Sequence, residues 1–485
     1  MANPPVFPRP GFDCLLSFSK RDNHPADLPM ITKSFQYLRT IAALFALSIV
    51  ALLNAGDKRP PNWVILFADN VGYGDLGCYG NRSVKTPNID RLANEGVRCM
   101  DIYVGSPSCM PSRGALLTGR SPVRNGLNEQ LWKNVSEEQI GLPHREKLLP
   151  QYLKAAGYIS GCFGKWNIGF APGSRPTERG FDEFFGHASG NIDYYSHLYD
   201  LRPDLYRGTN SVEVEGYSTD LFTDAACDFI KRNKNKPFFC YLPFNAAHYP
   251  NKRNKRPGQN FDWQVPDKYL KLYGSAATER DQKKRYLAVL SSIDDSVGRI
   301  LKTIDDSKLR EQTVVVFLSD NGAFMLPGRG LEVASNYPLR GGGVTLWEGG
   351  IRVPCIIRWP DRIPANSTCA EPLSAMDILP MVLKAANVAL PEKTIVDGID
   401  PTEVLVGEKA SPHSALFFEW GKEIAIRKRN WKLIRRTSND AWELYDLSSD
   451  ITETRNLAAR FPSIKERLEQ ELTNWLKNAR EEAKE

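Results

Sequence analysis

The residues most suited to chemistry stand together in one short stretch, residues 108–120. The stretch reads Ser-Cys-Met-Pro-Ser-Arg-Gly-Ala-Leu-Leu-Thr-Gly-Arg, and its Ala-Leu-Leu run predicts a buried helix. Cys109 then lies at the N-terminus of that helix, where unpaired N–H groups and the positive end of the helix dipole favour an anion. Arg113, one turn further on, adds a fixed positive charge that can hold an oxyanion. The stretch therefore predicts anion chemistry, although a lone cysteine is more often a buried apolar residue than a nucleophile.

Four apolar runs elsewhere in the chain read as buried strands, and polar residues follow each of them. The runs are residues 63–67, 158–163, 237–242 and 313–318, and the residues that follow them include Asp69, Asn70, Lys165, Asn167, His248, Asp320 and Asn321. Ligands of open α/β sheets bind at the carboxyl ends of the strands, so these side chains are candidates for one site. Taken singly, each has an ordinary structural explanation: a turn for the Asp-Asn pair, a solvated lysine and a structural histidine.

A metal site is the second chemistry that these residues indicate. The side chains of Asp69, Asn70, Asp320 and Asn321 offer only oxygen atoms, which form the ligand set of a hard cation. No thiolate or imidazole is among them to favour zinc. The pattern predicts a hard cation such as Ca²⁺ or Mg²⁺.

The stretch around Cys109 resembles the signature of the type I sulfatases, arylsulfatase-like enzymes of the alkaline phosphatase superfamily. Both halves of that signature, Cys-x-Pro-Ser-Arg and Leu-Thr-Gly-Arg, occur at the family's spacing. The resemblance implies that a formylglycine-generating maturation enzyme converts Cys109 to formylglycine, and that one hydroxyl of the hydrated aldehyde attacks sulfur. The implied function is hydrolysis of sulfate esters, and the substrate that we expect is a sulfated small molecule or glycan.

Other stretches carry the same resemblance, which covers essentially everything from Pro61 onwards. Their counterparts in the family are the N-terminal metal motif, the Gly-Lys-Trp-His-x-Gly string, the second metal pair and the end of the catalytic core. The matching stretches here are residues 69–75, 164–169, 319–322 and 338–354.

In the mechanism that the resemblance implies, the cation lowers the pKa of the diol and binds a sulfate oxygen. Arg113 orients the diol, and Lys165 neutralises charge on the sulfate. His248 donates a proton to the leaving alcohol. These roles are expectations that the structure can be compared with.

Three positions depart from the family's pattern. The second N-terminal metal carboxylate is Asn70 here, the histidine of Gly-Lys-Trp-His is Asn167, and the lysine usual after Leu-Arg-x-Gly is Gly343. Asn70 can still coordinate through its amide oxygen, but the site loses a negative charge. We expect Asn167 to bind substrate, and Arg340 or a residue of 172–210 to replace the cation lost at Gly343.

Two other functions remain open at this stage. Because losing one electrostatic contact to the transition state can cost about a hundredfold in rate, the chain could be a catalytically weakened sulfoglycan-binding relative. It could also be a phosphatase or phosphodiesterase of the same superfamily. That branch uses Ser or Thr as its nucleophile, so the Cys109 string favours a sulfatase.

Around these residues the sequence predicts an α/β fold. The βαβ alternation predicts a parallel sheet, and the resemblance makes it a large mixed, mostly parallel sheet sandwiched by helices. After about residue 400, short strands and an amphipathic helix predict a small antiparallel sheet plus helix. We expect a leader over residues 1–56, a catalytic domain over 57–400 and a C-terminal α+β subdomain over 401–485. Substrate specificity is expected in a long loop over residues 172–210 and a surface insertion over residues 251–267.

The composition is that of an ordinary soluble globular protein. Of 485 residues, 42% are hydrophobic and 25% are charged, with a formal net charge of +6. No basic stripe interleaved with aromatic residues appears, so nucleic acid is not an expected partner. Nine cysteines are scattered without metal-like spacing. An odd number in an exported protein leaves at least one unpaired, and Cys109 is the candidate.

An apolar run over residues 41–53, preceded by Lys33 and Arg39, predicts a signal peptide. The run is shorter than the roughly 20 residues that span a bilayer. Translation from Met30 would give a leader of normal shape, and an uncleaved anchoring helix is the alternative. We expect an exported protein, whether secreted, periplasmic or lysosome-like, with no stable membrane span.

Overall fold

The computed structural model describes residues 59–130, 141–256, 258–325 and 332–484. The predicted signal peptide and the start at Met30 lie outside these ranges. The compact unit described below begins at Pro60 and runs to the C-terminus. Among the described residues, no helix combines the length and apolar character needed to cross a membrane.

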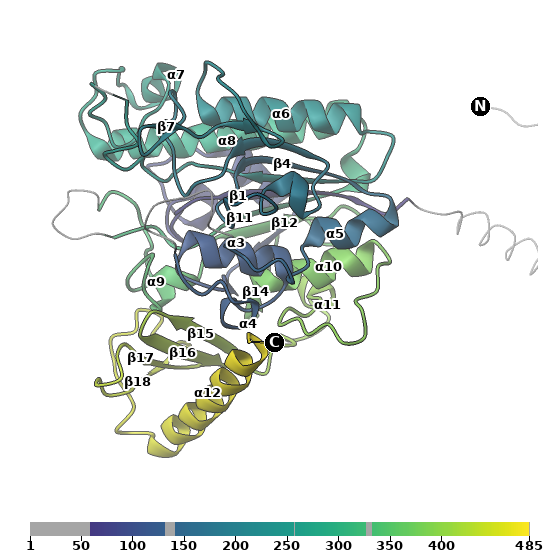
Figure 1. Cartoon of the computed structure of the whole chain (residues 1–485). Helices are drawn as coiled ribbons and strands as arrows, with labels where there is room; N and C mark the ends of the chain where they lie inside the picture. The colour runs from purple at the N-terminus through teal and green to yellow at the C-terminus, as the bar shows by residue number, and fades with distance from the viewer. Residues whose placement is uncertain (1–58, 131–140, 257, 326–331, 485) are drawn as a thin grey trace, which may run out of the picture. The chain divides into compact units, whose positions relative to one another are not determined.

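A ten-stranded sheet forms the centre of this unit (Figure 1). Its central strands pair in parallel, whereas β12 runs antiparallel to β11 and β2. In spatial order the strands are β13 (Ser367–Cys369), β2 (Val97–Cys99), β12 (Cys355–Arg358), β11 (Thr313–Ser319), β1 (Asn62–Ala68), β10 (Phe238–Pro243), β4 (Ile159–Lys165), β5 (Glu183–His187), β8 (Tyr206–Arg207) and β9 (Asn210–Ser211).

Helices cover both faces of the sheet, because the central strand β1 is apolar on both sides. Trp63, Ile65 and Phe67 belong to one buried apolar cluster, and Val64 and Leu66 belong to another. The first cluster includes residues of α3 (Cys109–Thr118), α5 (Leu149–Leu153) and α10 (Ile378–Ala385). The second includes residues of α2 (Pro87–Asn94), α6 (Ser218–Arg232) and α8 (Gln282–Asp306). In Figure 1, α6 and α8 lie on the side of the sheet opposite to α3, α5 and α10.

A second, antiparallel sheet of four strands lies in the C-terminal part and packs against a long helix. Its elements are β15 (Leu416–Trp420), β16 (Glu423–Lys428), β17 (Trp431–Arg435), β18 (Glu443–Asp446) and α12 (Pro462–Glu482). The predicted fold class is therefore confirmed. The division into domains at residue 400 stays a prediction.

The remaining elements are short and connect these layers. They are α4 (Pro122–Asn125), α7 (Asp267–Leu270), α9 (Glu348–Ile351), α11 (Thr402–Leu405), β3 (Ile102–Tyr103), β6 (Leu198–Tyr199), β7 (Arg202–Pro203), β14 (Leu373–Ser374), and the 3₁₀ helices η1 (Gly77–Tyr79), η2 (Lys154–Ala156), η3 (Pro176–Arg179), η4 (Lys271–Tyr273), η5 (Arg310–Gln312) and η6 (Ala375–Asp377).

One expectation about the sheet is wrong. The segment 172–210, predicted as a long loop, contains β5, a main-sheet strand that pairs in parallel with β4. The pairing requires a glycine, because a Cβ on Gly186 would lie 2.0 Å from the carbonyl oxygen of Gly164. Gly186 lowers the strand signal of the sequence, although it is what allows the two backbones to meet.

Candidate active site

Cys109 is the first residue of α3, preceded by Ser108 in an extended conformation. Its thiol donates to Oδ1 of Asp69 at 3.3 Å and lies 3.8 Å from Oδ1 of Asn70. Burial, together with the Asp320 and Asp69 carboxylates, raises the pKa of the Cys109 thiol well above its usual range. The unmodified cysteine is therefore a protonated thiol at neutral pH and a poor nucleophile.

The adjacent strands β1 and β11 place the four predicted oxygen ligands at one edge of the sheet. The N–H of Asp320 donates to the carbonyl of Ala68 at 2.9 Å, and the N–H of Asn70 donates to Oδ1 of Asp320 at 3.1 Å. Asn70 adopts a left-handed backbone with φ of 58°, which asparagine tolerates better than most residues. These bonds fix the two strand-end turns to each other.

The geometry of these residues fits a hard cation. Ligand atoms of Asp69, Cys109 and Asp320 lie within 4.8 Å of one another, and all three residues are buried. Nδ2 of Asn321 donates to Oδ1 of Asn70 at 2.6 Å, and Oδ1 of Asn321 is buried with no hydrogen-bond partner in the part of the chain that the structure describes. Burial and the neighbouring Asp69 raise the pKa of Asp320. An unpaired amide oxygen and two crowded carboxylates are groups that a divalent cation would satisfy.

Two fully buried cations face these carboxylates. Arg113 donates to Oδ2 of Asp320 from Nη2 at 2.7 Å and from Nε at 3.1 Å, and its Nη1 donates to the carbonyl of Lys165 at 3.0 Å. Nζ of Lys165 pairs with Oδ2 of Asp69. The two positive charges compensate the two negative ones, as buried ionised groups require.

A small cavity of about 60 Å³ opens beside the thiol. Four of the predicted residues line it: Cys109, Lys165, Asn167 and His248. The sequence did not single out the other residues of its wall, which are Ser108, Gln130, Phe170, Gly190, Asn191, Tyr199, Asn251 and Phe324. Gly190, Asn191, Tyr199 and Asn251 belong to the segments 172–210 and 251–267, in which specificity was expected.

His248 is held in one tautomer. Its Nδ1 lies 2.6 Å from the carbonyl oxygen of Tyr249, a distance at which Nδ1 carries the proton and donates. Burial and the positive charge of Lys165 lower the pKa of His248 to about 3. The free protein therefore has a neutral imidazole whose Nε2 is left to exchange a proton with a ligand.

Asn167 has no internal use for its side chain. It is 1% exposed, and among the described residues neither its amide nitrogen nor its amide oxygen has a hydrogen-bond partner. Since the residue lines the cavity, its donor and acceptor are available to a ligand.

Arg340 lies elsewhere than expected. Its Nη1 donates to the carbonyl of Glu453 at 2.6 Å and to the hydroxyl of Tyr445 at 3.2 Å, and its guanidinium carbon lies 3.7 Å from the ring centre of Trp347. These contacts hold Arg340 against the C-terminal part of the chain. Among the described residues that line the cavity Arg340 does not appear, and its role as the replacement for the cation missing at Gly343 stays a prediction.

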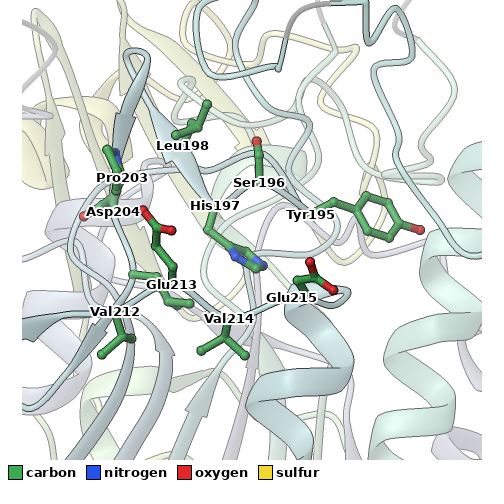
Figure 2. A pocket seen from close by; sticks show the side chains of 11 residues that line it. Tyr195, Ser196, His197, Leu198, Pro203, Asp204, Val212, Glu213, Val214 and Glu215 are labelled. Atoms are coloured by element: carbon green, nitrogen blue, oxygen red, sulfur yellow. The ribbon is translucent and has the colours of Figure 1, made fainter.

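A larger cavity of about 510 Å³ lies beside β6 and β7 (Figure 2). Asp204, Glu213 and Glu215 are among its lining residues, and they give it an acidic wall. None of the predicted site residues lines it, and carboxylates repel a sulfate anion. The smaller cavity at Cys109 is therefore the candidate active site.

Known proteins similar to this chain include sulfatases. The sequence matches the family model described as Sulfatase over residues 61–388, and the model described as N-sulphoglucosamine sulphohydrolase, C-terminal, over residues 344–482. The N-acetylgalactosamine-6-sulfatase of Canis lupus familiaris is 34% identical, with 86% of this chain and 79% of that protein aligned. Arylsulfatase A of Homo sapiens is 33% identical, with 87% and 89% aligned.

Solved structures agree with the sequence comparison. The crystal structure of Ps i-CgsB in complex with k-i-k-neocarrahexaose is 28% identical, with a TM-score of 0.78 over 86% of this chain and 93% of that chain. The PsFucS1 sulfatase from Pseudoalteromonas sp. is 26% identical, with a TM-score of 0.73 over 90% and 94%. The chain belongs to the sulfatase family and is a sulfuric ester hydrolase.

Proposed function

We propose that the protein hydrolyses the sulfate ester of a sulfated carbohydrate in the cavity beside Cys109, with position 109 as formylglycine and Ca²⁺ or Mg²⁺ at the adjoining oxygen ligands. One observation carries this proposal. The Cys109 thiol, at the N-terminus of α3, lies 3.3 Å from Asp69 in a cavity that Lys165, Asn167 and His248 also line.

The divalent cation and formylglycine would each supply one part of the chemistry. Asp69, Asn70, Asp320 and Asn321 would hold the cation, whose charge would polarise a sulfate oxygen. Formylglycine at position 109 would supply the hydroxyl that attacks sulfur.

The chain's own residues bind the ester and move the proton. Lys165 and the N-terminal N–H groups of α3 place positive charge around the sulfate oxygens. Asn167 offers them a neutral hydrogen-bond donor. The bound sulfate anion raises the proton affinity of His248, so that Nε2 can hold a proton and pass it to the leaving oxygen.

The proposed substrate is a sulfated sugar. Amide side chains (Gln130, Asn191 and Asn251) and aromatic ones (Phe170 and Tyr199) line the cavity, and both kinds suit a sugar's hydroxyl groups and carbon face. One relative is an N-acetylgalactosamine-6-sulfatase, and one structural neighbour was crystallised with a neocarrahexaose. N-acetylgalactosamine 6-sulfate is therefore the first sugar to test.

The test combines mass spectrometry with turnover. The protein is exported from a host that modifies other sulfatases, and the mass of the peptide containing residue 109 is measured. The converted protein is then assayed with 4-nitrophenyl sulfate, N-acetylgalactosamine 6-sulfate and 4-nitrophenyl phosphate, with Ca²⁺, Mg²⁺ or EDTA. We expect an aldehyde at position 109 and sulfate-ester turnover that EDTA removes. A plain thiol at position 109 contradicts the mechanism, binding without turnover supports the sulfoglycan-binding alternative, and preference for the phosphate ester supports the phosphatase alternative.

We also propose that the segment 1–56 directs export and is removed. Residues 41–53 supply the apolar part of a signal peptide. N-terminal sequencing of the exported protein checks this proposal, which predicts a start close to Asp57. Recovery of a chain that still carries the apolar run would favour the anchoring alternative.

A further inference from the structure

Phe324 brings an apolar ring into the candidate active site. It lies five residues beyond β11 and lines the same cavity as Cys109 and Lys165. Its ring stands edge-on to the imidazole of His248, with the ring centres 5.7 Å apart and an interplanar angle of 82°. The ring therefore borders the space next to the group that protonates the leaving oxygen.

The ring of Phe324 can occupy this position because residue 343 is a glycine and has no side chain. A Cβ at position 343 would lie 2.1 Å from Cδ1 and 2.3 Å from Cε1 of Phe324. Non-bonded carbon atoms do not approach each other this closely, so no side chain at position 343 is compatible with the ring in this position. The N–H of Gly343 also donates to the carbonyl of Ala323 at 3.0 Å, which fixes the two segments to each other. Phe324 and Gly343 thus form one coupled feature.

The position of the ring relates it to one part of the substrate. In the proposed reaction the sulfate lies at residue 109 and the leaving oxygen faces His248. Phe324, in edge contact with His248, then adjoins the first carbon atoms of the leaving group. The face of an aromatic ring attracts C–H groups and the edges of other rings, and it repels an anion.

We propose that Phe324, admitted by Gly343, is a specificity-determining residue that selects leaving groups with a ring-shaped apolar face, such as a pyranose or an aryl group, over short alkyl chains. This inference rests on the proposed function and refines its substrate class.

The first experiment compares two classes of sulfate ester. Phe324→Ala is expected to lower kcat/KM about tenfold for 4-nitrophenyl sulfate and N-acetylgalactosamine 6-sulfate, while kcat/KM for ethyl sulfate stays within about twofold. Phe324→Tyr should keep the preference for rings. Phe417→Ala, which removes a ring stacked on Trp475 in the C-terminal part, is the matched control and should change neither class. An equal loss for all three esters would mean that the ring positions His248 rather than selecting substrates, and this would overturn the proposal.

The second experiment tests the coupling to Gly343. Gly343→Ala is expected to lower turnover of the ring esters as Phe324→Ala does, because the added methyl group displaces the ring. The double variant should then be no worse than Phe324→Ala alone. A Cβ at position 343 would also lie 2.8 Å from the carbonyl oxygen of Gly322. If that backbone contact dominates, the two losses will multiply and the coupling is refuted.

A binding measurement separates this inference from the proposed function. In Cys109→Ala, which cannot turn substrate over, calorimetry gives the Kd of 4-nitrophenyl sulfate and of ethyl sulfate. We expect the aryl ester to bind more tightly, and Phe324→Ala in that background to reduce the difference about tenfold. Equal affinities before the second substitution would refute the role of Phe324, whether or not the unmutated protein hydrolyses sulfate esters.

Discussion

Two asparagines at the candidate site stand where the backbone is left-handed, with φ of 58° at Asn70 and 54° at Asn167. Asparagine is among the few residues with a side chain that adopt this conformation readily. Both positions depart from the sulfatase pattern by losing a group that can carry charge. With Asn70, the proposed metal site holds one negative charge fewer than the family's pattern implies, and position 167 cannot titrate.

Asn167 is expected to reduce stability while serving function. Asn167→Gly keeps the left-handed backbone and removes a buried amide without partners, so we expect the free energy of unfolding to stay the same or rise by about 1 kcal/mol. We expect kcat/KM for sulfate esters to fall at least tenfold, through a higher KM, because the hydrogen-bond donor to the sulfate is gone. Urea unfolding and steady-state kinetics check the two halves. A variant that is less stable and fully active would contradict this role.

His187 makes stability depend on pH. It is fully buried, and burial together with the positive charges of Lys165 and Arg113 lowers its pKa well below the usual value. Below about pH 6.5 the unfolded chain binds a proton at this residue, whereas the folded protein does not, so stability is lost as the pH falls.

The variant His187→Phe lacks this titration. Between pH 7 and pH 5 the free energy of unfolding should therefore fall less in the variant than in the unmutated protein, by about 2 kcal/mol at most. Urea unfolding at the two pH values measures the difference. Identical pH dependence in the two proteins would show that His187 does not contribute.

At the scale of elements, Asp75 anchors the turn that follows β1. Its Oδ2 accepts from the N–H of Gly72 at 2.8 Å and from the hydroxyl of Tyr286 at 2.5 Å, and its Oδ1 accepts from the N–H of Ser335 at 2.8 Å. This buried carboxyl therefore joins the turn that holds Asp69 to α8 and to the segment before Gly343.

Asp75→Ala should loosen that turn. Leaving three buried donors unpaired is expected to cost about 2–4 kcal/mol of unfolding free energy and to raise the Ca²⁺ concentration needed for half-maximal activity. Asp90→Ala is the matched control, since Asp90 accepts from the N–H of Cys78 at 2.8 Å farther along the chain. The control should lose stability without a change in the response to Ca²⁺. A shared change in both variants would count against a specific role of Asp75.

The elements that the sequence predicted best are those with an unbroken apolar run or a regular alternation. The short strands predicted after residue 400 became β15, β16 and β17, and the run 313–318 became β11. β5 escaped prediction because its signal consists of two phenylalanines beside a glycine. That glycine is required by contact with β4, which lies about twenty positions earlier in the chain.

The candidate site was predictable where a residue follows a buried strand, because the sheet then dictates its position. Asp69, Lys165, His248 and Asp320 belong to this group. The cavity wall was not predictable, because Tyr199 lies in the two-residue strand β6 and Phe324 in an irregular segment, and the course of both depends on tertiary contacts. Arg340 shows the converse, because a suitable charge in a family-like stretch turned out to contact Glu453 and Trp347 instead.

At the scale of the whole molecule, a buried ion cluster joins the C-terminal sheet to the catalytic part. Nζ of Lys432 in β17 lies 3.0 Å from Oε1 of Glu348 in α9 and 2.8 Å from Oε1 of Glu453, and all three side chains are fully buried. The N–H of Glu348 also donates to Oε2 of Glu453 at 2.8 Å. The segment that contains Gly343 is thereby fixed from the C-terminal side.

Lys432→Met should remove the cation that Glu348 and Glu453 share, leaving Glu348 paired with Arg352 at 3.4 Å, and lower the free energy of unfolding by about 3–5 kcal/mol. Lys428→Met is the matched control on the neighbouring strand, because Lys428 pairs with the partly exposed Glu471 and should cost less than about 1 kcal/mol. Chemical denaturation measures both. Equal losses would mean that the buried cluster does not tie the two parts together.

The central position of β1 also affects when the sheet can form during synthesis of the chain. Asn62 at the start of β1 pairs with Thr313 at the start of β11, 251 residues later. A ribosome adds about 5–20 residues per second, so β1 waits roughly 12–50 s for the strand that completes its hydrogen bonds. Helices and hairpins form within microseconds, so synthesis rather than local folding sets this interval. Until it ends, the cavity around Cys109 lacks Asp320 and is incomplete.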